Sequence, residues 1–432
     1  MQRLYRGSED DVEGISLPFR RISRVRRKFY LGINYNDYRQ LKDFIIPFGT
    51  EVIDSEAFSG CFSLTNITIP DSIKVIGPRS FEGCYSLTNI AIPNSVTSIG
   101  FSAFRGCSSL NNFTIPNSVT SIGSSAFSKC SSITNIIIPN SITTIASEVF
   151  RGCKSLTHIT IPNTVTEIGN YAFKECSSLT EISIPNSVTS IGSSAFSECS
   201  SLTEFTIPNN ITEIAEGAFS YCKSLINISI PNSVSIICKN AFENCESLTN
   251  IIIPNSVTEI GSFAFNYCES LTNITIPNSV IEVGFNILNG CKSLTNITIP
   301  NIYEIIGRNV LFGETILNGV YLPFSVKILN NNTFIENEIY SVIISDSFNS
   351  IGSNAFSGCY FLKNIFIPKS VTSIGESAFS DCHNLTNVII QNSDILIGDY
   401  AFSFCFSLSC INIPGNARIG FNAFIGCLDS DR

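Results

Sequence analysis

The stretch "SSLNNFTIPNSVTSIGSSAFSKC", residues 108–130, decides the fold, because near-copies of these 23 residues fill most of the chain. The following segment opens "SSITNIIIPNSITTIASEVF" at Ser131, and the preceding one ends "TNIAIPNSVTSIGFSAFRGC" at Cys107. A fixed period of this kind indicates stacked repeats, each of which buries its apolar residues only against its neighbours. We therefore expect a repeat architecture, although 432 residues would otherwise suggest two or three domains.

Cysteine sets the register of the repeat. It recurs every 23 residues from Cys61 to Cys291, and the spacing resumes at Cys359. The leading apolar position runs from Leu41 to Leu408, which defines 17 copies with no linker between them. A period in this range with the pattern L-x-x-I-x-I is typical of leucine-rich repeats. The sequence thus predicts a repeat solenoid, a β-rich right-handed superhelix of about 17 turns of 23 residues with one main strand per turn.

Alternation within one copy predicts which side chains are buried. In "LTNITIP", residues 64–70, we expect Leu64, Ile67 and Ile69 to face the core and Asn66 and Thr68 to face outward. The proline then ends the strand, because it has no N–H to donate. "SVTSIG" is expected to return as a second short strand on the opposite wall, and its glycine permits a tight bend. "SSAF" and "GC" are expected to complete the turn as one helical turn, with phenylalanine filling the core.

The string "IPNSVTSIGSSAFSKCSSITNI", residues 115–136, resembles the BspA-like leucine-rich repeats, also called the Treponema pallidum type. The combination of AF-x-x-C with L-x-x-I-x-I-P carries the resemblance, which covers about residues 41–428. It implies a surface-exposed role in adhesion, as a surface antigen or in protein binding, without enzymatic activity. It implies no particular ligand.

Charge and hydropathy exclude some functions and leave the compartment open. Residues 1–44 hold 10 Lys and Arg against 6 Asp and Glu, whereas the remainder holds 16 against 29. An acidic body argues against nucleic acid as a partner, because phosphate binding needs a basic surface. No run reaches the roughly 18 apolar residues of a transmembrane segment, and "MQRLYRGSEDDVEG" lacks the apolar core of a secretion signal. The resemblance favours the cell surface, and the missing signal favours the cytoplasm.

Three regions are predicted along the chain. Residues 1–40 form an N-terminal extension with the basic cluster "FRRISRVRRKF", for which a cap on the first turn, a nuclear-import or nucleic-acid patch and a membrane-surface segment all remain open. Residues 41–428 form the solenoid. Within it, residues 301–347 keep the apolar register but lose the Cys, Phe and Gly markers, which indicates either tolerated drift or a binding or hinge element.

We predict no catalytic, cofactor or metal site. The 17 cysteines lie mostly in one inward column, where free thiols act as small apolar groups, so buried free thiols are favoured over disulfides. Zinc needs close pairs such as C-x-x-C, and none occurs. Only His158 and His383 are available as imidazole bases, and no nucleophile or phosphate-binding motif is present, so no enzyme is expected.

The outward face of the main strands is the expected binding surface. Its central column is mostly asparagine, which favours a ladder of amides bonded to one another. His158, Glu181 and Glu204 replace the amide in three successive copies, and neighbouring carboxylates repel unless a cation or basic partner neutralises them. The alternative is that these three replacements are sequence drift on a solvated face, without a function. We predict a partner contact here, formed by Asn135, His158, Glu181, Glu204 and Asn227.

The leading hypothesis is a non-enzymatic module that binds a protein or glycoconjugate through many weak polar contacts, in host or matrix adhesion. An intracellular protein-interaction scaffold is the alternative, favoured by the free cysteines. Binding of ice by the threonine columns is a third hypothesis, opposed by the curvature usual in this class of repeat. The oligomeric state is not specified by the sequence.

Overall fold

A computed structural model describes residues 24–25, 40–111, 113–277, 279–284, 286–294, 296–298, 316–317, 319–322, 328–329, 338–339, 341–344 and 349–427. The described residues form a parallel β-solenoid of about 14 turns, which confirms the predicted class; the sequence predicted about 17 turns. It consists of two compact units, Met1–Asn210 and Ile211–Arg432, and each is described by itself.

Each turn has three walls, named here from the turn that begins at Leu64. Wall A holds the longer strand, β4 (Asn66–Thr68). Wall B holds a two-residue strand, β5 (Val75–Ile76). Wall C is the segment from residue 78 to the cysteine at 84, which has no strand. The second short strand expected on the opposite wall is therefore present.

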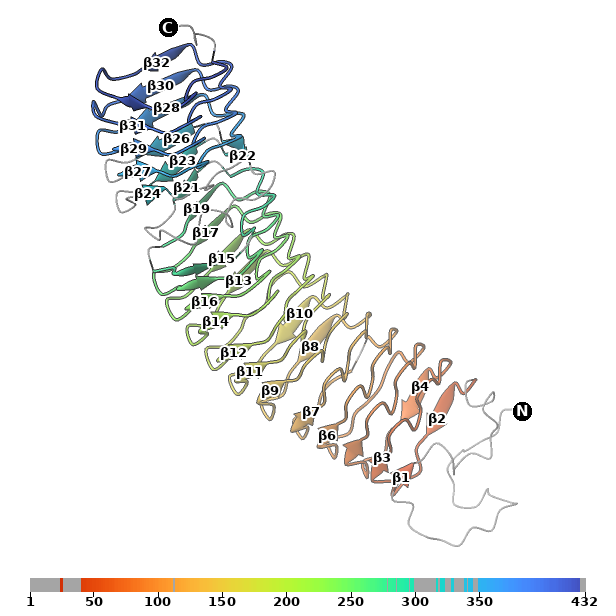
Figure 1. Cartoon of the computed structure of the whole chain (residues 1–432). Helices are drawn as coiled ribbons and strands as arrows, with labels where there is room; N and C mark the ends of the chain where they lie inside the picture. Colours follow the sequence, from red (N-terminus) through yellow and green to blue (C-terminus); the bar gives the residue numbers. More distant parts are fainter. Residues whose placement is uncertain are drawn as a thin grey trace. The chain divides into compact units, whose positions relative to one another are not determined.

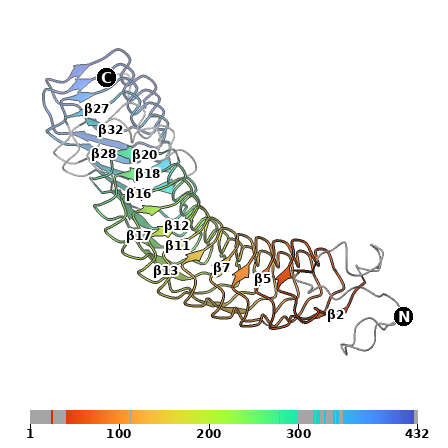
Figure 2. The ribbon, with the colours of Figure 1, turned by 90° about the horizontal axis from the view of Figure 1, so that it is seen from below.

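The first unit contains β1 to β13, which follow one another in chain order (Figure 1). Its wall A strands are β2 (Asp43–Ile45), β4, β8 (Asn135–Ile137), β10 (His158–Thr160) and β13 (Glu204–Thr206). The remaining strands are short: β1 (Arg24–Val25), β3 (Val52–Ile53), β5, β6 (Ser98–Ile99), β7 (Ser121–Ile122), β9 (Thr144–Ile145), β11 (Glu167–Ile168) and β12 (Ser190–Ile191). All but β1 belong to wall B, and the turns can be followed from a second direction in Figure 2.

The second unit repeats this arrangement. Wall A holds β15 (Asn227–Ser229), β17 (Asn250–Ile252), β19 (Asn273–Thr275), β21 (Asn296–Thr298), β23 (Gly319–Leu322), β26 (Ser341–Ile344), β28 (Asn364–Ile367), β30 (Asn387–Ile390) and β32 (Cys410–Asn412). Wall B holds β14 (Glu213–Ile214), β16 (Ile236–Ile237), β18 (Glu259–Ile260), β20 (Glu282–Val283), β24 (Ile328–Leu329), β27 (Ser350–Ile351), β29 (Ser373–Ile374), β31 (Leu396–Ile397) and β33 (Arg418–Ile419). One further pair joins β22 (Ile316–Leu317) to β25 (Glu338–Ile339).

Strand pairing between successive turns is parallel and keeps the 23-residue register. Asp43 pairs with Asn66 on wall A, and Val52 pairs with Val75 on wall B. Residues one repeat apart are therefore lateral neighbours, so each column of the sequence is a column on the molecule. In the second unit, wall A is continuous over eight strands from β17 to β32.

The degenerate copies keep this pairing where the structure describes them. Val320 of β23 pairs with Val342 of β26, a step of 22 residues, and Val342 pairs with Ile365 of β28, a step of 23. The missing residue thus lies outside the paired strands. Most of residues 301–347 lie outside the described residues, and the choice between drift and a hinge or binding element concerns them.

Wall C corrects one expectation, because no helical turn forms at "SSAF". The N–H of Glu56 donates to the carbonyl of Pro78 in the next turn, at 2.9 Å, and that of Ala57 donates to Asp54 within the turn, at 3.2 Å. This alternation requires left-handed backbone at two positions per turn, such as Glu56 (φ 60°) and Gly60 (φ 74°). A helix would direct every N–H along its own turn, whereas the alternation also bonds neighbouring turns together.

The core is a set of stacked columns. Leu64, Ile67 and Ile69 are buried and Asn66 and Thr68 are exposed, as predicted. The wall C phenylalanines stack face to face along the first unit, with ring centroids 5.2 Å apart between Phe58 and Phe81 and 5.1 Å between Phe81 and Phe104. Full burial of such a ring stabilises the fold by about 1.5–3 kcal/mol. No single turn could supply this burial alone.

The N-terminal extension adds one strand to the first unit. Arg24 of β1 pairs with Val52 of β3 in parallel, so a part of the basic cluster lies beside the first strand of wall B. This pairing favours the interpretation of residues 1–40 as a cap, which stays a proposal. Apart from Gln40, the other residues of the extension lie outside the described residues.

Candidate functional site on the strand-lined face

The outward side of wall A presents polar side chains because alternate residues of each strand point away from the core. Asn135 and His158 are directly paired neighbours on β8 and β10, and both are exposed. The Nδ1 atom of His158 lies 2.9 Å from the hydroxyl of Thr157, which in turn donates to the carbonyl of Thr134 at 3.0 Å. The imidazole is thus oriented by its own strand, with its other ring nitrogen directed away from this bond.

The two predicted carboxylates are exposed, but only one stands on a strand. Glu204 begins β13, whereas residues 181–183 form no strand, so wall A of the first unit is interrupted at Glu181. In the part of the chain that the structure describes, neither carboxylate forms an ion pair. Asn227 is exposed and begins β15 of the second unit. Partner binding by these five residues stays a prediction.

The predicted amide ladder forms between Asn387 and Asn364, where Nδ2 of Asn387 donates to Oδ1 of Asn364 at 3.0 Å. In the first unit, Asn66 Nδ2 donates to the carboxylate oxygen Oδ1 of Asp43 at 2.8 Å. Asn273 Nδ2 donates to the hydroxyl of Thr272 beside it, at 3.0 Å. The exposed face thus combines amide, carboxylate and hydroxyl groups in one register.

Exposed apolar residues on wall A were missed by the sequence reasoning. They occupy the outward position at which many copies carry threonine: Ile45, Ile137, Ile252, Phe366 and Ile389. A signal was available, because aligning the copies places these five residues in the column of Thr68 and Thr160. They make parts of the face less polar than the consensus repeat predicts.

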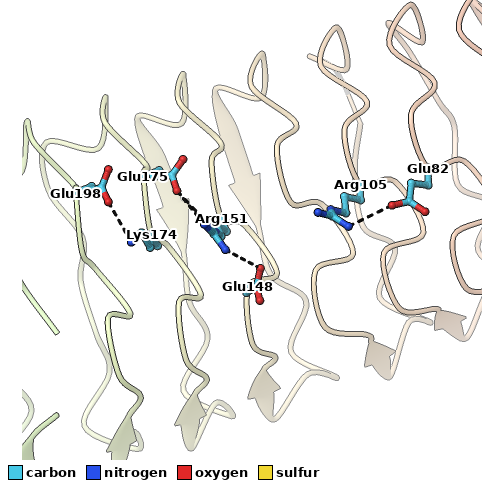
Figure 3. A network of polar contacts seen from close by, with 7 residues as sticks. All are labelled: Glu82, Arg105, Glu148, Arg151, Lys174, Glu175 and Glu198. Atoms are coloured by element: carbon cyan, nitrogen blue, oxygen red, sulfur yellow. Dashed lines mark hydrogen bonds and ion pairs between the residues drawn. The ribbon is translucent and has the colours of Figure 1, made fainter. Parts of the chain in front are cut away.

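Wall C carries ion pairs that also escaped the sequence reasoning. Figure 3 shows Glu82 with Arg105 and Lys174 with Glu198, each pair joining neighbouring turns at 3.3 Å and 3.0 Å. Arg151 lies between Glu148 of its own turn and Glu175 of the next, at 3.2 Å and 3.3 Å. Such exposed pairs contribute about 0–1 kcal/mol each. Their charges neutralise one another, unlike the two carboxylates of wall A.

The cysteine column is buried and its thiols are free, as predicted. Fourteen of the sixteen cysteines whose side chains the structure describes are buried, and all sixteen are free. Most of these thiols donate to a phenylalanine carbonyl of the preceding turn, for example Cys153 Sγ to Phe127 O at 3.3 Å. Burial raises the pKa of Cys153 to about 12. These thiols are therefore unsuited to act as nucleophiles near neutral pH.

Cys238 differs, because it replaces the wall B glycine and is half-buried. Burial, and then the nearby carboxylates of Glu213, Glu259 and Glu216, raise its pKa to about 11. Among the described residues, no three side chains of His, Cys, Asp or Glu are grouped as metal ligands. Within the described residues, no helix is long and apolar enough to cross a bilayer.

Parallel walls, a 23-residue register and buried leucine, isoleucine, phenylalanine and cysteine columns define a leucine-rich-repeat solenoid. The family model of the BspA type leucine rich repeat region (6 copies) matches residues 33–157, 120–247, 212–340 and 305–430. The chain belongs to this family.

Solved structures of bacterial leucine-rich-repeat proteins are similar to the chain. A leucine-rich repeat protein from Bacteroides ovatus is 33% identical, over 79% of this chain and 85% of that chain, with a TM-score of 0.61. A leucine rich cell surface protein from Faecalibacterium prausnitzii is 26% identical, over 87% and 88%, with a TM-score of 0.43. The T. pallidum leucine rich repeat protein is 27% identical, over 42% and 75%, with a TM-score of 0.31. No curated protein matches the chain.

Proposed function

We propose that the chain is a non-enzymatic binding module that recognises a protein or glycoconjugate through wall A, in adhesion at a cell surface. The exposed outward columns of wall A carry this proposal, because they add nothing to the core yet hold amides, an imidazole and carboxylates in a fixed register. Many weak polar contacts over such a face give specificity by complementarity, without a deep pocket. The family supports a protein-binding repeat module.

Glu181 and Glu204 are the residues on which we test this function. Their exposed carboxylates lack ion-pair partners in the described structure, so a partner with basic groups is favoured here. Proteins cross-linked to the full chain on its native cells would be identified, and the main one purified. We expect Glu181→Lys with Glu204→Lys to weaken its binding at least tenfold, measured by surface plasmon resonance.

The matched control reverses two exposed carboxylates on wall B of the same unit, Glu51→Lys with Glu167→Lys. This variant changes the net charge equally and should bind as the unchanged chain does. Equal loss in both variants would indicate general charge attraction, and no loss in either would remove the first unit's wall A from the binding surface.

The adhesion role requires that the chain be outside the cell. Intact native cells would be treated with a membrane-impermeant biotin reagent, and we expect the chain to be labelled along with known surface proteins. A cytosolic protein serves as the control for leakage. Labelling only after lysis would contradict adhesion and favour the intracellular scaffold.

A further inference from the structure

Wall A of the second unit carries an apolar column across neighbouring strands. Phe366 of β28 and Ile389 of β30 are directly paired and are 42% and 48% exposed. The register continues to Ile343 of β26 on one side and Asn412 of β32 on the other. Adjacent exposed apolar residues form a continuous strip, which a partner can cover more fully than a single side chain.

Other exposed isoleucines of wall A stand alone. Ile252 of β17 is 76% exposed and pairs with Thr275, and Ile137 of β8 is 65% exposed and pairs with Thr160. Single exposed apolar residues are common on soluble proteins. The pairing of Phe366 with Ile389 therefore sets this part of the face apart.

Two lysines and two amides border the strip. Lys363 immediately precedes β28 and Lys369 follows it after Pro368, and both lysines are exposed. Neither forms an ion pair with any residue that the structure describes. Along the chain, Phe366 thus has an exposed cation three residues before it and another three residues after it. The bonded amides of Asn364 and Asn387 lie in the adjacent outward column.

We propose that this surface, formed by Lys363, Asn364, Phe366, Lys369, Asn387 and Ile389 and named here the β28–β30 surface, binds an acidic amphipathic α-helix of a partner protein. The inference deepens the proposed function and rests on it, since it specifies the chemistry of a partner for wall A. The lysines pair with carboxylates on the flanks of the helix, and Phe366 and Ile389 contact its apolar stripe.

The spacing of the strip favours a helix that lies across the strands. Neighbouring strands are about 4.8 Å apart, and the apolar stripe of a helix recurs about every 5.4 Å, so each helical turn meets one strand. An extended segment in the same direction repeats its side chains on one face roughly every 6.8 Å, which matches the strands less well. Amides beside the strip can bond polar side chains on one flank of the helix.

Binding is tested with the full chain and a fluorescent helical peptide of about 18 residues, long enough to form a helix. The peptide has leucines on one stripe and glutamates on both flanks, and its comparator has lysine at every glutamate. We expect the acidic peptide to bind at least tenfold more tightly by fluorescence anisotropy. Phe366→Thr installs the residue common in other copies and should weaken binding about tenfold, the effect of losing one central anchor.

Further variants separate the contribution of the lysines to peptide binding from that of the apolar strip. Lys363→Glu with Lys369→Glu should reverse the preference toward the basic peptide. Ile252→Thr makes the same kind of substitution at an isolated position of the same sheet and should leave binding unchanged. Circular dichroism and thermal unfolding confirm that each variant is folded.

Three results would overturn the inference: no binding of either peptide, equal binding of both, or equal loss from Ile252→Thr and Phe366→Thr. They would leave the proposed function standing, because that is tested with a cross-linked partner and with residues of the first unit. The proposed function would instead fail if the cross-linked partner bound the Glu181→Lys, Glu204→Lys variant as tightly as the unchanged chain.

Discussion

At the scale of the residue, the buried cysteines combine two roles. They fill small apolar spaces beside the phenylalanine stack, and most of them donate the S–H to a carbonyl of the preceding turn, as Cys176 does to Phe150 at 3.2 Å. An alanine would leave that carbonyl one donor short and a small cavity beside it. A thiolate cannot donate this bond, and it would be an unpaired charge in the core.

This column makes the fold sensitive to alkali. Burial raises the pKa of Cys153, Cys199 and Cys291 to about 12 from an ordinary value of 9.0. Above pH 9 the unfolded chain therefore binds fewer protons than the native chain, and stability falls as the pH rises toward 12. Each such thiol contributes a slope of about 1.4 kcal/mol per pH unit in that range. Urea unfolding at pH 8, 9 and 10 under reducing conditions measures the slope.

The control is the variant Cys153→Ala with Cys199→Ala. It should be less stable than the unchanged chain at pH 8, because two cavities form. Its stability should nevertheless fall less steeply above pH 9, since two raised pKa values are gone. Tyrosine and lysine ionise in both chains, so the difference in slope reports the thiols. Identical slopes would contradict the account.

At the scale of the element, wall C depends on left-handed backbone. The position before each wall C cysteine of the complete described copies is left-handed whether glycine occupies it, as at Gly152 (φ 73°), or not, as at Lys129 (φ 61°). Residues with a Cβ are strained there by about 1–2 kcal/mol. The bonds to the next turn hold this backbone, for example from the N–H of Lys129 to the carbonyl of Arg151 at 2.6 Å.

Opposite substitutions in these consecutive turns should have opposite effects. Gly152→Ala should reduce the free energy of unfolding by about 1 kcal/mol, mainly through backbone strain. Its Cβ would lie 3.3 Å from the flexible Lys129 Cγ and at ordinary van der Waals distances of 3.5 Å and 3.7 Å from the Lys129 Cα and backbone nitrogen. Lys129→Gly should raise the free energy of unfolding by up to about 1 kcal/mol, because it relieves the strain. The greater conformational freedom of glycine in the unfolded chain offsets part of this gain. Urea midpoints of both variants measure the two changes.

Gly169→Ala provides the comparison for this pair. Its Cβ would lie 2.6 Å from the backbone nitrogen of Ser147, so the loss should exceed that of Gly152→Ala. A stabilised Gly152→Ala, or a destabilised Lys129→Gly, would contradict the assignment of strain to the left-handed backbone.

The elements also show how far sequence reasoning extends. Strict alternation in "LTNITIP" was sufficient to predict wall A, and the constant cysteine spacing predicted its register, because both depend on burial. Wall C could not be predicted, since its left-handed positions carry residues as different as Glu56, Tyr171 and Phe263. The backbone there is set by bonds between turns, which no single copy contains.

The candidate site was predicted less completely than the fold. Outward exposure of His158 and Glu204 followed from alternation, whereas the break in wall A at Glu181 did not, since "LTEISIP" fits the strand pattern as well as its neighbours do. The strip of Phe366 and Ile389 could have been predicted from the aligned copies, but the predicted binding surface was based on the polar columns alone.

At the scale of the whole molecule, each unit is built from nearest neighbours. Inter-turn bonds join residues about one repeat apart, as in the N–H of Phe104 to the carbonyl of Ala126 at 2.8 Å. Stability in such an array is the sum of turn and interface contributions, so damage should stay close to where it is made. The division at Asn210 has no counterpart in the repeat pattern and was not predicted.

Truncation of one core phenylalanine tests this locality. Phe104 is fully buried between Phe81 and Phe127, with centroids 5.1 Å and 5.4 Å away, so Phe104→Ala should cost about 3–5 kcal/mol. Hydrogen exchange followed by mass spectrometry should show faster exchange in the turns next to residue 104 and no change in residues 349–427. Phe379→Ala, which removes a ring stacked 5.0 Å from Phe356, should give the reverse pattern. Uniform acceleration along the chain in either variant would mean that the repeats unfold as one cooperative body, and the nearest-neighbour account would then fail.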